Sequence, residues 1–139
     1  MTDIITVKTT VNASLDDAWR AYTSSEAITR WDFASTEWHC PSAQVDLRAG
    51  GRHCARMEAR DGSIGFDYEG AYETVEPERS LRLRLTDGRF VQTTFESTDA
   101  GTVMRTVFDP DHAAPADMQR AGGQAILDND AEFVARGAA

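Results

Sequence analysis

The chain has 139 residues, 41% of them hydrophobic, and its 23 acidic against 14 basic side chains give a net charge of −9. That length suits a single domain, residues 1–139, whose core needs neither a disulfide nor a metal. The acid excess argues against nucleic acid and against an anionic membrane surface as partners, because both require a basic face.

The sequence also indicates a compartment. No apolar run reaches the roughly 20 residues of a membrane span, and the first residues lack the pattern of a signal peptide. We therefore expect a cytoplasmic protein, with Cys40 and Cys54 as free thiols in a reducing environment.

Residues 4–31 predict one strand followed by two short helices. Residues 4–11 carry alternating β-branched side chains, the pattern of a half-buried strand. Ser14 precedes two acidic residues, which is a typical helix start, and the helix that follows has one apolar stripe. A second short helix begins at Ser24 and ends near Trp31.

The middle of the chain predicts an antiparallel sheet. Short turns such as Asp61-Gly62 and Asp87-Gly88 separate the β segments, which lie near 44–48, 52–59, 66–76, 80–87, 90–98 and 102–109. Connections this short leave no room for crossover helices, so neighbouring strands run antiparallel. Leucines alternate with arginines in the segment near 80–87, which indicates one buried and one solvent-exposed face.

The last segment predicts a helix of about 20 residues. Pro115 suits its first turn. The expected inner stripe has three- and four-residue steps and consists of Met118, Gly122, Ala125, Ile126, Asn129 and Phe133. The fold class is therefore α+β: a curved antiparallel sheet of about six to seven strands, two short helices after the first strand, and one long helix on the concave face.

Two His-Cys pairs, His39-Cys40 and His53-Cys54, are the most unusual local pattern. Two histidines and two cysteines could supply a zinc set. Adjacent residues of a strand point to opposite faces, however, and the usual zinc spacings are absent, so we expect no metal and no other cofactor. A histidine base beside a cysteine nucleophile is conceivable between neighbouring strands, but one core and one exposed member in each pair is the simpler interpretation.

Acidic residues gather on the central strands. Two-residue periodicity separates aromatic from acidic side chains, with Phe66, Tyr68 and Tyr72 on one face and Asp67, Glu69 and Glu73 on the other. If the aromatics face inward, the acids form a solvated outer face, which is the favoured interpretation. The alternative makes Glu58 or Asp67 an inward-facing candidate base whose burial raises its pKa. A third reading pairs these acids with Arg56.

Several motifs follow one another along nearly the whole chain. They are Val11-Asn12-Ala13-Ser14, Ile28-Thr29-Arg30-Trp31, Asp46-Leu47-Arg48 with Gly50-Gly51, the run from Arg56 to Asp67, and Met118-Gln119-Arg120 through Asn129. The ordered set resembles the SRPBCC superfamily, also called START or birch-pollen-allergen-like. Within it, the chain most resembles bacterial homologues of the heat-shock protein 90 ATPase activator. The resemblance implies a helix-grip fold with a cavity between the sheet and the long helix.

Two residues depart from that family's pattern. Gly123 stands where members commonly have a tryptophan after Gly122, and Asp130 stands where an aromatic is common. If residue 123 faces the sheet, the cavity is larger in this chain. If it faces a partner, a dimer contact is weakened. The sequence leaves both readings open.

The resemblance also implies a site for a small apolar or amphipathic molecule. The candidate lining residues are Trp31, Phe33, Trp38, His53, Tyr68, Tyr72, Phe108, Met118 and Ile126. A second copy of the chain, in a homodimer, is a further candidate partner. Two other functions stay open: a small enzyme of the polyketide cyclase, dehydratase or hydrolase type, with Glu58 and Asp67 as weak catalytic candidates, and a chaperone-associated interaction protein. The identity of the ligand does not follow from the sequence.

Overall fold

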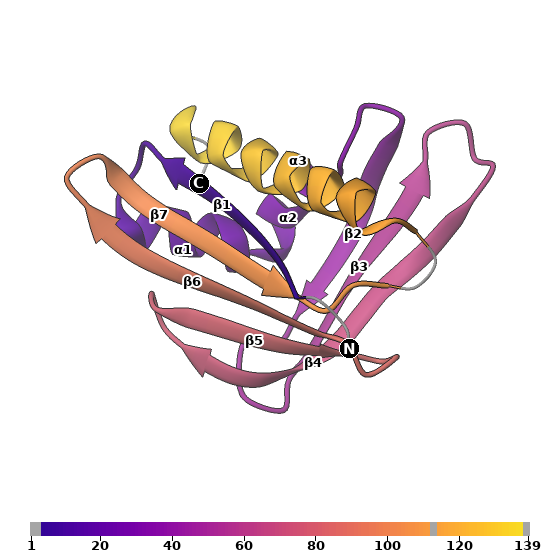
Figure 1. The fold of residues 1–139 in the computed structure, drawn as a ribbon, viewed down its shortest axis with the longest axis horizontal. Coiled ribbons are helices and arrows are strands. Elements are labelled where there is room, and N and C mark those ends of the chain that lie inside the picture. The colour runs from indigo at the N-terminus through magenta and orange to yellow at the C-terminus, as the bar shows by residue number, and fades with distance from the viewer. Residues whose placement is uncertain (1–3, 112–113, 138–139) are drawn as a thin grey trace.

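The computed structural model describes residues 4–111 and 114–137, and within them the chain forms seven strands and three helices (Figure 1). Their bounds in chain order are β1 Ile5–Val11, α1 Leu15–Thr23, α2 Ser25–Trp31, β2 Trp38–Val45, β3 Arg52–Ala59, β4 Gly65–Glu76, β5 Ser80–Leu85, β6 Phe90–Thr98, β7 Gly101–Phe108 and α3 Ala116–Ala135. None of the helices in the described ranges is both long enough and apolar enough to cross a membrane.

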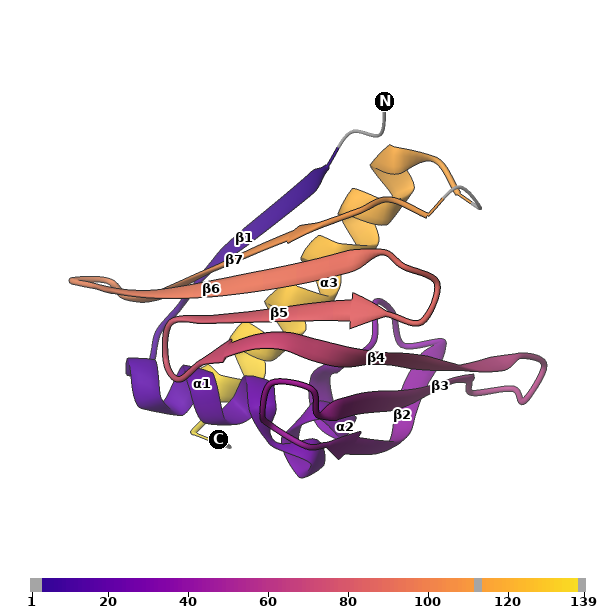
Figure 2. The ribbon, with the colours of Figure 1, turned by 90° about the horizontal axis from the view of Figure 1, so that it is seen from below.

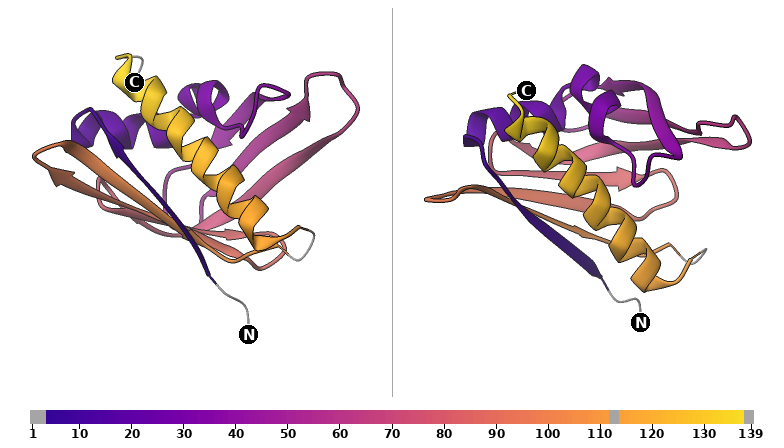
Figure 3. Two further views of the ribbon diagram at one scale, coloured as in Figure 1. Left: turned by 45° about the horizontal axis from the view of Figure 1, so that its top comes forward. Right: turned by 90° about the horizontal axis from the view of Figure 1, so that it is seen from above.

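The strands form one antiparallel sheet in the order β1-β7-β6-β5-β4-β3-β2. The sheet curls, and α3 lies across its concave face, as Figures 1 and 2 show. The short helices α1 and α2 lie at one end of this trough, beside the C-terminal half of α3 (Figure 3). The predicted α+β class and the helix-grip arrangement are confirmed.

Two serines begin the short helices, as the sequence predicted. Ser14 Oγ accepts a hydrogen bond from the Asp17 backbone N–H at 3.1 Å, and Ser24 Oγ accepts one from the Ala27 backbone N–H at 3.3 Å. Each bond satisfies a first-turn N–H that the helix itself leaves unpaired. The helix α2 follows α1 directly. Its last residue, Trp31, is buried in a core cluster that includes residues of β3.

The alternation of leucine and arginine in β5 sets its two faces. Leu81, Leu83 and Leu85 are 5–7% exposed and point into the core, whereas Arg82 and Arg84 point to the outer face and bond Glu73. Successive strand residues face opposite ways, so this one segment fixes which side of the central sheet faces α3. The predicted buried and solvent-exposed faces are confirmed here.

The strand β2 begins at Trp38, whereas the sequence indicated a start near residue 44. The earlier start was not predicted because Pro41 lies within the strand, and a proline has no N–H to donate to a neighbouring strand. The structure places β2 at the sheet edge, paired only with β3, and its register shifts between His39 and Ser42. An edge strand with an irregular register is where proline is tolerated.

The inner face of α3 is rotated by one residue from the predicted stripe. Met118, expected to face inward, is 64% exposed. The side chains that line the interior or are buried belong to Gln119, Gly123, Ile126, Leu127, Asp130 and Val134. The hydropathy pattern placed the face wrongly because Gln119, Gly123 and Asp130 carry no large apolar side chain. One residue corresponds to about 100° around the helix axis.

Candidate ligand-binding site

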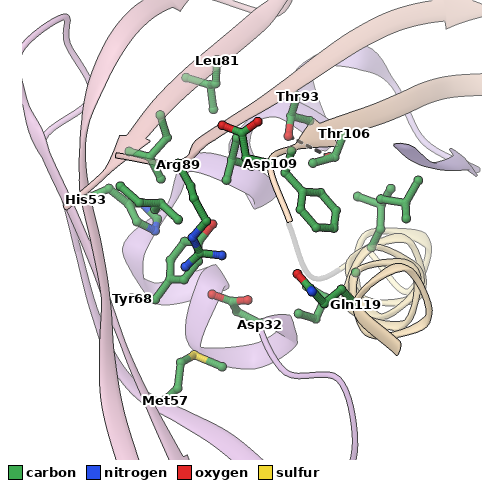
Figure 4. Close-up of a pocket in the computed structure, with 18 of the residues that line it drawn as sticks. Asp32, His53, Met57, Tyr68, Leu81, Arg89, Thr93, Thr106, Asp109 and Gln119 are labelled. Carbon is green, nitrogen blue, oxygen red and sulfur yellow. Dashed lines mark hydrogen bonds between the residues drawn. The ribbon is translucent and has the colours of Figure 1, made fainter. Parts of the chain in front are cut away.

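A cavity of about 430 Å³ lies between the concave face of the sheet, α2 and the N-terminal part of α3 (Figure 4). Aliphatic side chains from the sheet and from α3 form much of its wall: Val7, Leu81, Leu83, Leu85, Val91, Ile126 and Leu127. Aromatic side chains form most of the rest: Tyr22, Trp31, Phe66, Tyr68, Tyr72 and Phe108. A predominantly apolar lining with a few polar groups is typical of small-molecule sites.

The structure brings six of the nine candidate ligand residues together in this wall. They are Trp31, His53, Tyr68, Tyr72, Phe108 and Ile126. Phe33 and Trp38 are not in the lining and instead pack against the neighbouring core cluster. Met118 lies outside the cavity, exposed to solvent, because the inner face of α3 is rotated by one residue.

Glu58 and Asp67, the candidate catalytic acids, lie on the outer face of the sheet. Arg56 Nε bonds Glu58 Oε2 at 2.9 Å, and Arg56 Nη1 lies 3.4 Å from Asp67 Oδ1. The side chains of Glu58 and Asp67 are 38% and 54% exposed. The alternative of a desolvated catalytic base at either residue is therefore corrected: both acids are solvated, and both pair with Arg56.

The two His-Cys pairs follow the alternation of their strands. His53 lines the cavity, whereas the next residue, Cys54, faces outward; Cys40 is buried, and His39 lies beside Glu58 on the outer face. Both cysteines are free. Within the described ranges, no three potential metal ligands gather at one point. Burial lowers the pKa of His53 to about 4, so its ring is neutral at pH 7, and Nδ1 shares a 2.9 Å hydrogen bond with the Tyr72 hydroxyl.

A chain of hydroxyl groups crosses one wall of the cavity. The Tyr22 hydroxyl lies 2.9 Å from Thr93 Oγ1, which lies 2.8 Å from Thr106 Oγ1 (Figure 4). The Tyr22 ring stacks on Trp31, with 5.2 Å between ring centroids, and the Trp31 indole N–H donates to the Ala21 carbonyl at 3.0 Å. These contacts hold the aromatic wall in place and satisfy its polar atoms. Burial raises the pKa of Tyr22 to about 12, so its hydroxyl keeps its proton.

Asp32 brings a carboxyl group into the cavity, and the sequence analysis missed it. It caps the C-terminus of α2 directly after Trp31, and its side chain points into the space between Tyr68 and α3 (Figure 4). Burial raises the pKa of Asp32 to about 7. One signal could have found it: an acid at a helix C-terminus opposes the helix dipole, so its presence there calls for another reason.

Asp130 is a second interior acid, on the inner face of α3. It is 0% exposed, and neither carboxyl oxygen has a hydrogen-bond partner among the described residues. Burial raises the pKa of Asp130 to about 8, and the charge of nearby Asp32 contributes to the rise. The sequence flagged this residue only as a departure from the family pattern, without placing it beside Asp32.

Arg89 contributes a guanidinium group to the lining, and it has acidic partners. Its Nε bonds Asp87 Oδ2 at 2.8 Å, and its Nη2 lies 3.8 Å from Asp111 Oδ2. Two other polar lining groups are also satisfied. Asp109 accepts a hydrogen bond from the Phe90 backbone N–H, and the Gln119 amide donates to backbone carbonyls before α3.

Gly123 faces the sheet from α3 and lines the cavity. A Cβ atom there would lie 3.2 and 3.3 Å from the Phe108 ring and 3.7 Å from Val7 Cγ1. At Gly122 a Cβ atom would meet nothing within 4 Å. Of the two readings left open by the sequence, the geometry favours the one in which glycine at 123 leaves space in the interior.

Comparisons with known proteins agree with this fold. Residues 12–132 match the family model described as Activator of Hsp90 ATPase homolog 1-like protein. The solution structure of an AHSA1-like protein from Aeromonas hydrophila is 36% identical, with a TM-score of 0.90, over 99% of this chain and 96% of that one. A search of curated proteins gives no match.

Two further solved structures are similar. A protein from Cytophaga hutchinsonii, solved in solution, is 37% identical, with a TM-score of 0.82, over 96% of this chain and 92% of that one. A crystal structure from Chromobacterium violaceum is 20% identical, with a TM-score of 0.86, over 96% of this chain and 98% of that one. At that identity the last comparison shows likeness of fold alone.

Proposed function

The chain belongs to the family of Activator of Hsp90 ATPase homolog 1-like proteins, and from that membership we propose that it binds a small amphipathic molecule between the sheet and α3. The family belongs to the SRPBCC superfamily, whose fold commonly binds ligands. Fold alone does not assign a function, so the proposal depends on the site itself.

One observation carries the proposal: the interior is open where a packed core would be expected. Protein interiors are normally filled to the density of organic crystals, with few voids larger than a water molecule. A cavity of about 430 Å³ is far above that size. It lies within the range of small-molecule pockets, roughly 300–1,000 Å³. An apolar ligand would recover the dispersion contacts that the empty wall lacks.

The enzyme alternative has less support from the geometry. Its candidate acids, Glu58 and Asp67, lie on the opposite face of the sheet from the cavity. The polar groups that do line the cavity mostly bond one another or the backbone, as in the Tyr22–Thr93–Thr106 chain. Such groups orient a ligand rather than attack it.

The two adjacent glycines of α3 provide a matched test. Gly123→Leu would place a side chain against Phe108, in the cavity, whereas Gly122→Leu would place one where a Cβ meets no neighbour. Octanol, naphthol and tryptophol serve as probes with apolar bodies and one hydroxyl. We expect at least one of them to raise the Tm of the wild type and of Gly122→Leu, but not that of Gly123→Leu. A ligand at about 100 times its Kd stabilises a protein by about 2.7 kcal/mol, or several degrees in Tm.

The smaller change Gly123→Ala guards against misfolding of the leucine variant. It should weaken binding of the same probe less than Gly123→Leu does, because it fills less of the cavity. Equal binding to Gly122→Leu and Gly123→Leu would contradict the proposed site. The same holds if no probe binds the wild type, including the amines described below.

A further inference from the structure

We propose that the ligand carries a protonated nitrogen, which binds at the Asp32 carboxylate while the apolar body lies against the aromatic and aliphatic wall. This inference rests on the proposed function and narrows its ligand class from amphipathic molecules in general to amines. It assigns Asp32 as the residue that selects the ligand's polar group.

The first support is the missing partner of Asp32. Within the described ranges its carboxyl group makes no hydrogen bond and no ion pair, and it points into the cavity (Figure 4). Other polar lining groups, such as His53, Thr93 and Arg89, have protein partners. An ionised carboxylate only accepts hydrogen bonds, and a charge that lies against an apolar wall without a partner is costly. The ligand group that completes this site is therefore a donor with positive charge.

The second support is the balance of charge around Asp32. His53 of β3 also lines the cavity, where burial lowers its pKa to about 4 and keeps its ring neutral at pH 7. The charge of Asp32 acts on titratable groups of four other elements: Tyr22 of α1, Cys40 of β2, Tyr68 of β4 and Asp130 of α3. None of these can be a cation. The charge of Arg89 reaches Tyr68, but the guanidinium bonds Asp87 and lies near Asp111. Within residues 4–111 and 114–137, no cation therefore lies within ion-pair distance of Asp32, and a ligand cation can neutralise it.

The third support is the aromatic surface beside the carboxyl group. Trp31 directly precedes Asp32, and Tyr22 and Tyr68 line the same part of the cavity. Aromatic faces attract cations through the negative face of the ring, most strongly where water is excluded. A carboxylate among aromatic rings favours an ammonium group over a hydroxyl, and it repels a carboxylate.

The ionisation of Asp32 also fits a cationic partner. Burial raises its pKa to about 7, so the group is half ionised near neutral pH. Near pH 7, little free energy is needed to ionise Asp32 fully when an amine binds. Below about pH 7, the affinity for an amine falls up to about tenfold for each pH unit, because Asp32 must first release a proton.

Matched probes with one apolar body and different polar groups test the inference. One set is octylamine, octanol and nonanoate, and another is tryptamine, tryptophol and indolepropionate. Calorimetry at about pH 8, where Asp32 is ionised, measures their Kd values. We expect the amine of a set to bind the wild type about tenfold or more tightly than its alcohol, the size of one charge-assisted hydrogen bond. The carboxylate should bind most weakly.

Asp32→Asn removes the charge and keeps the shape. It should weaken amine binding about tenfold, leave alcohol binding nearly unchanged, and abolish the loss of amine affinity below about pH 7. Retained alcohol binding shows that the variant is folded. Asp99→Asn, in the exposed turn between β6 and β7, makes the same change in net charge and should bind all probes as the wild type does.

The outcomes separate the two proposals. If an alcohol or a carboxylate binds as tightly as its amine, or if Asp32→Asn binds amines as the wild type does, the amine inference is wrong and the binding function stands. If no alcohol, amine or carboxylate binds, the proposed function fails and the inference fails with it.

Discussion

The acids on the outer face of the sheet and the acids in its interior have opposite surroundings. Outside, Glu73 bonds both Arg82 and Arg84, and Glu69 bonds Arg52. Inside, Asp32 lies in an apolar cavity, and Asp130 is fully buried with neither oxygen hydrogen-bonded within the described ranges. The same functional group, a carboxyl group, pairs with arginines on one side of the sheet and has no cationic partner among the described residues on the other.

This difference separates structural charges from candidate functional ones. Exposed ion pairs contribute little net stability, and salt screens them. A buried acid without a partner lowers stability, and perturbed acids in cavities are typical of functional sites. The outer acids therefore belong to a solvated surface on which acidic and basic side chains pair. The inner acids lie where a ligand can supply a positively charged hydrogen-bond donor, which the described protein residues do not provide.

The largest effect on stability is expected at Asp130. Folding raises the pKa of its carboxyl group to about 8, so the folded state keeps a proton that the unfolded state loses above about pH 4. Wild-type stability should therefore fall relative to Asp130→Asn as the pH rises from about 4 to about 8, and the difference should then stay constant. One pKa unit corresponds to about 1.4 kcal/mol, so we expect the difference in stability between the variant and the wild type to change by roughly 5 kcal/mol across this window.

Urea unfolding of both proteins across that pH window measures the gain. The exposed Asp99→Asn should track the wild type throughout. A difference between Asp130→Asn and the wild type that does not change with pH would mean that Asp130 ionises normally in the folded protein. Asp130 would then no longer differ from the outer acids, and Asp32 would be the one remaining example of a perturbed inner acid among the described residues.

The smallest effect is expected at Glu73 on the outer face. Its bonds to Arg82 and Arg84 lower its pKa, so the stability it contributes is present above its unfolded pKa and is lost as the pH falls. Glu73→Gln should destabilise the protein less than Asp130→Asn stabilises it, and high salt should remove the effect. Urea unfolding at low and high salt checks this, with the exposed Glu96→Gln of β6 as the matched control.

Glu73→Gln should also leave binding of octanol and octylamine unchanged, because the side chain lies on the face away from the cavity. A loss of probe binding in this variant would show that the outer face takes part in the site. The division of the acids into two groups would then be wrong.

Periodicity predicted the parts of the fold that repeat. The alternation of Leu81, Leu83 and Leu85 with arginines, and the serine caps of α1 and α2, gave the inward face of the sheet and the two short helices. It failed where a functional or irregular residue interrupts the pattern. Pro41 hid the start of β2, and the non-apolar residues of the inner face of α3 shifted the predicted stripe by one position.

The site was harder to predict than the fold. Six lining residues were anticipated. Five of them are large apolar or aromatic residues, the usual mark of an interior position, and His53 was expected inside as one member of a His-Cys pair on a strand. Asp32 was missed because only its position in the folded chain distinguishes it. It lies at the end of α2, where its side chain points into the cavity, and Asp130 of α3 lies near it. Such convergence of separate elements is a property of the folded chain, which local sequence patterns do not contain.

A crystal structure of the protein with tryptamine tests the central claim most directly. The account predicts electron density for the indole between the sheet and α3, against Phe108 and Tyr68, with the amine nitrogen within hydrogen-bond distance of the Asp32 carboxylate. Tryptamine bound among the arginines and acids of the outer face, with the cavity free of it, would contradict the account.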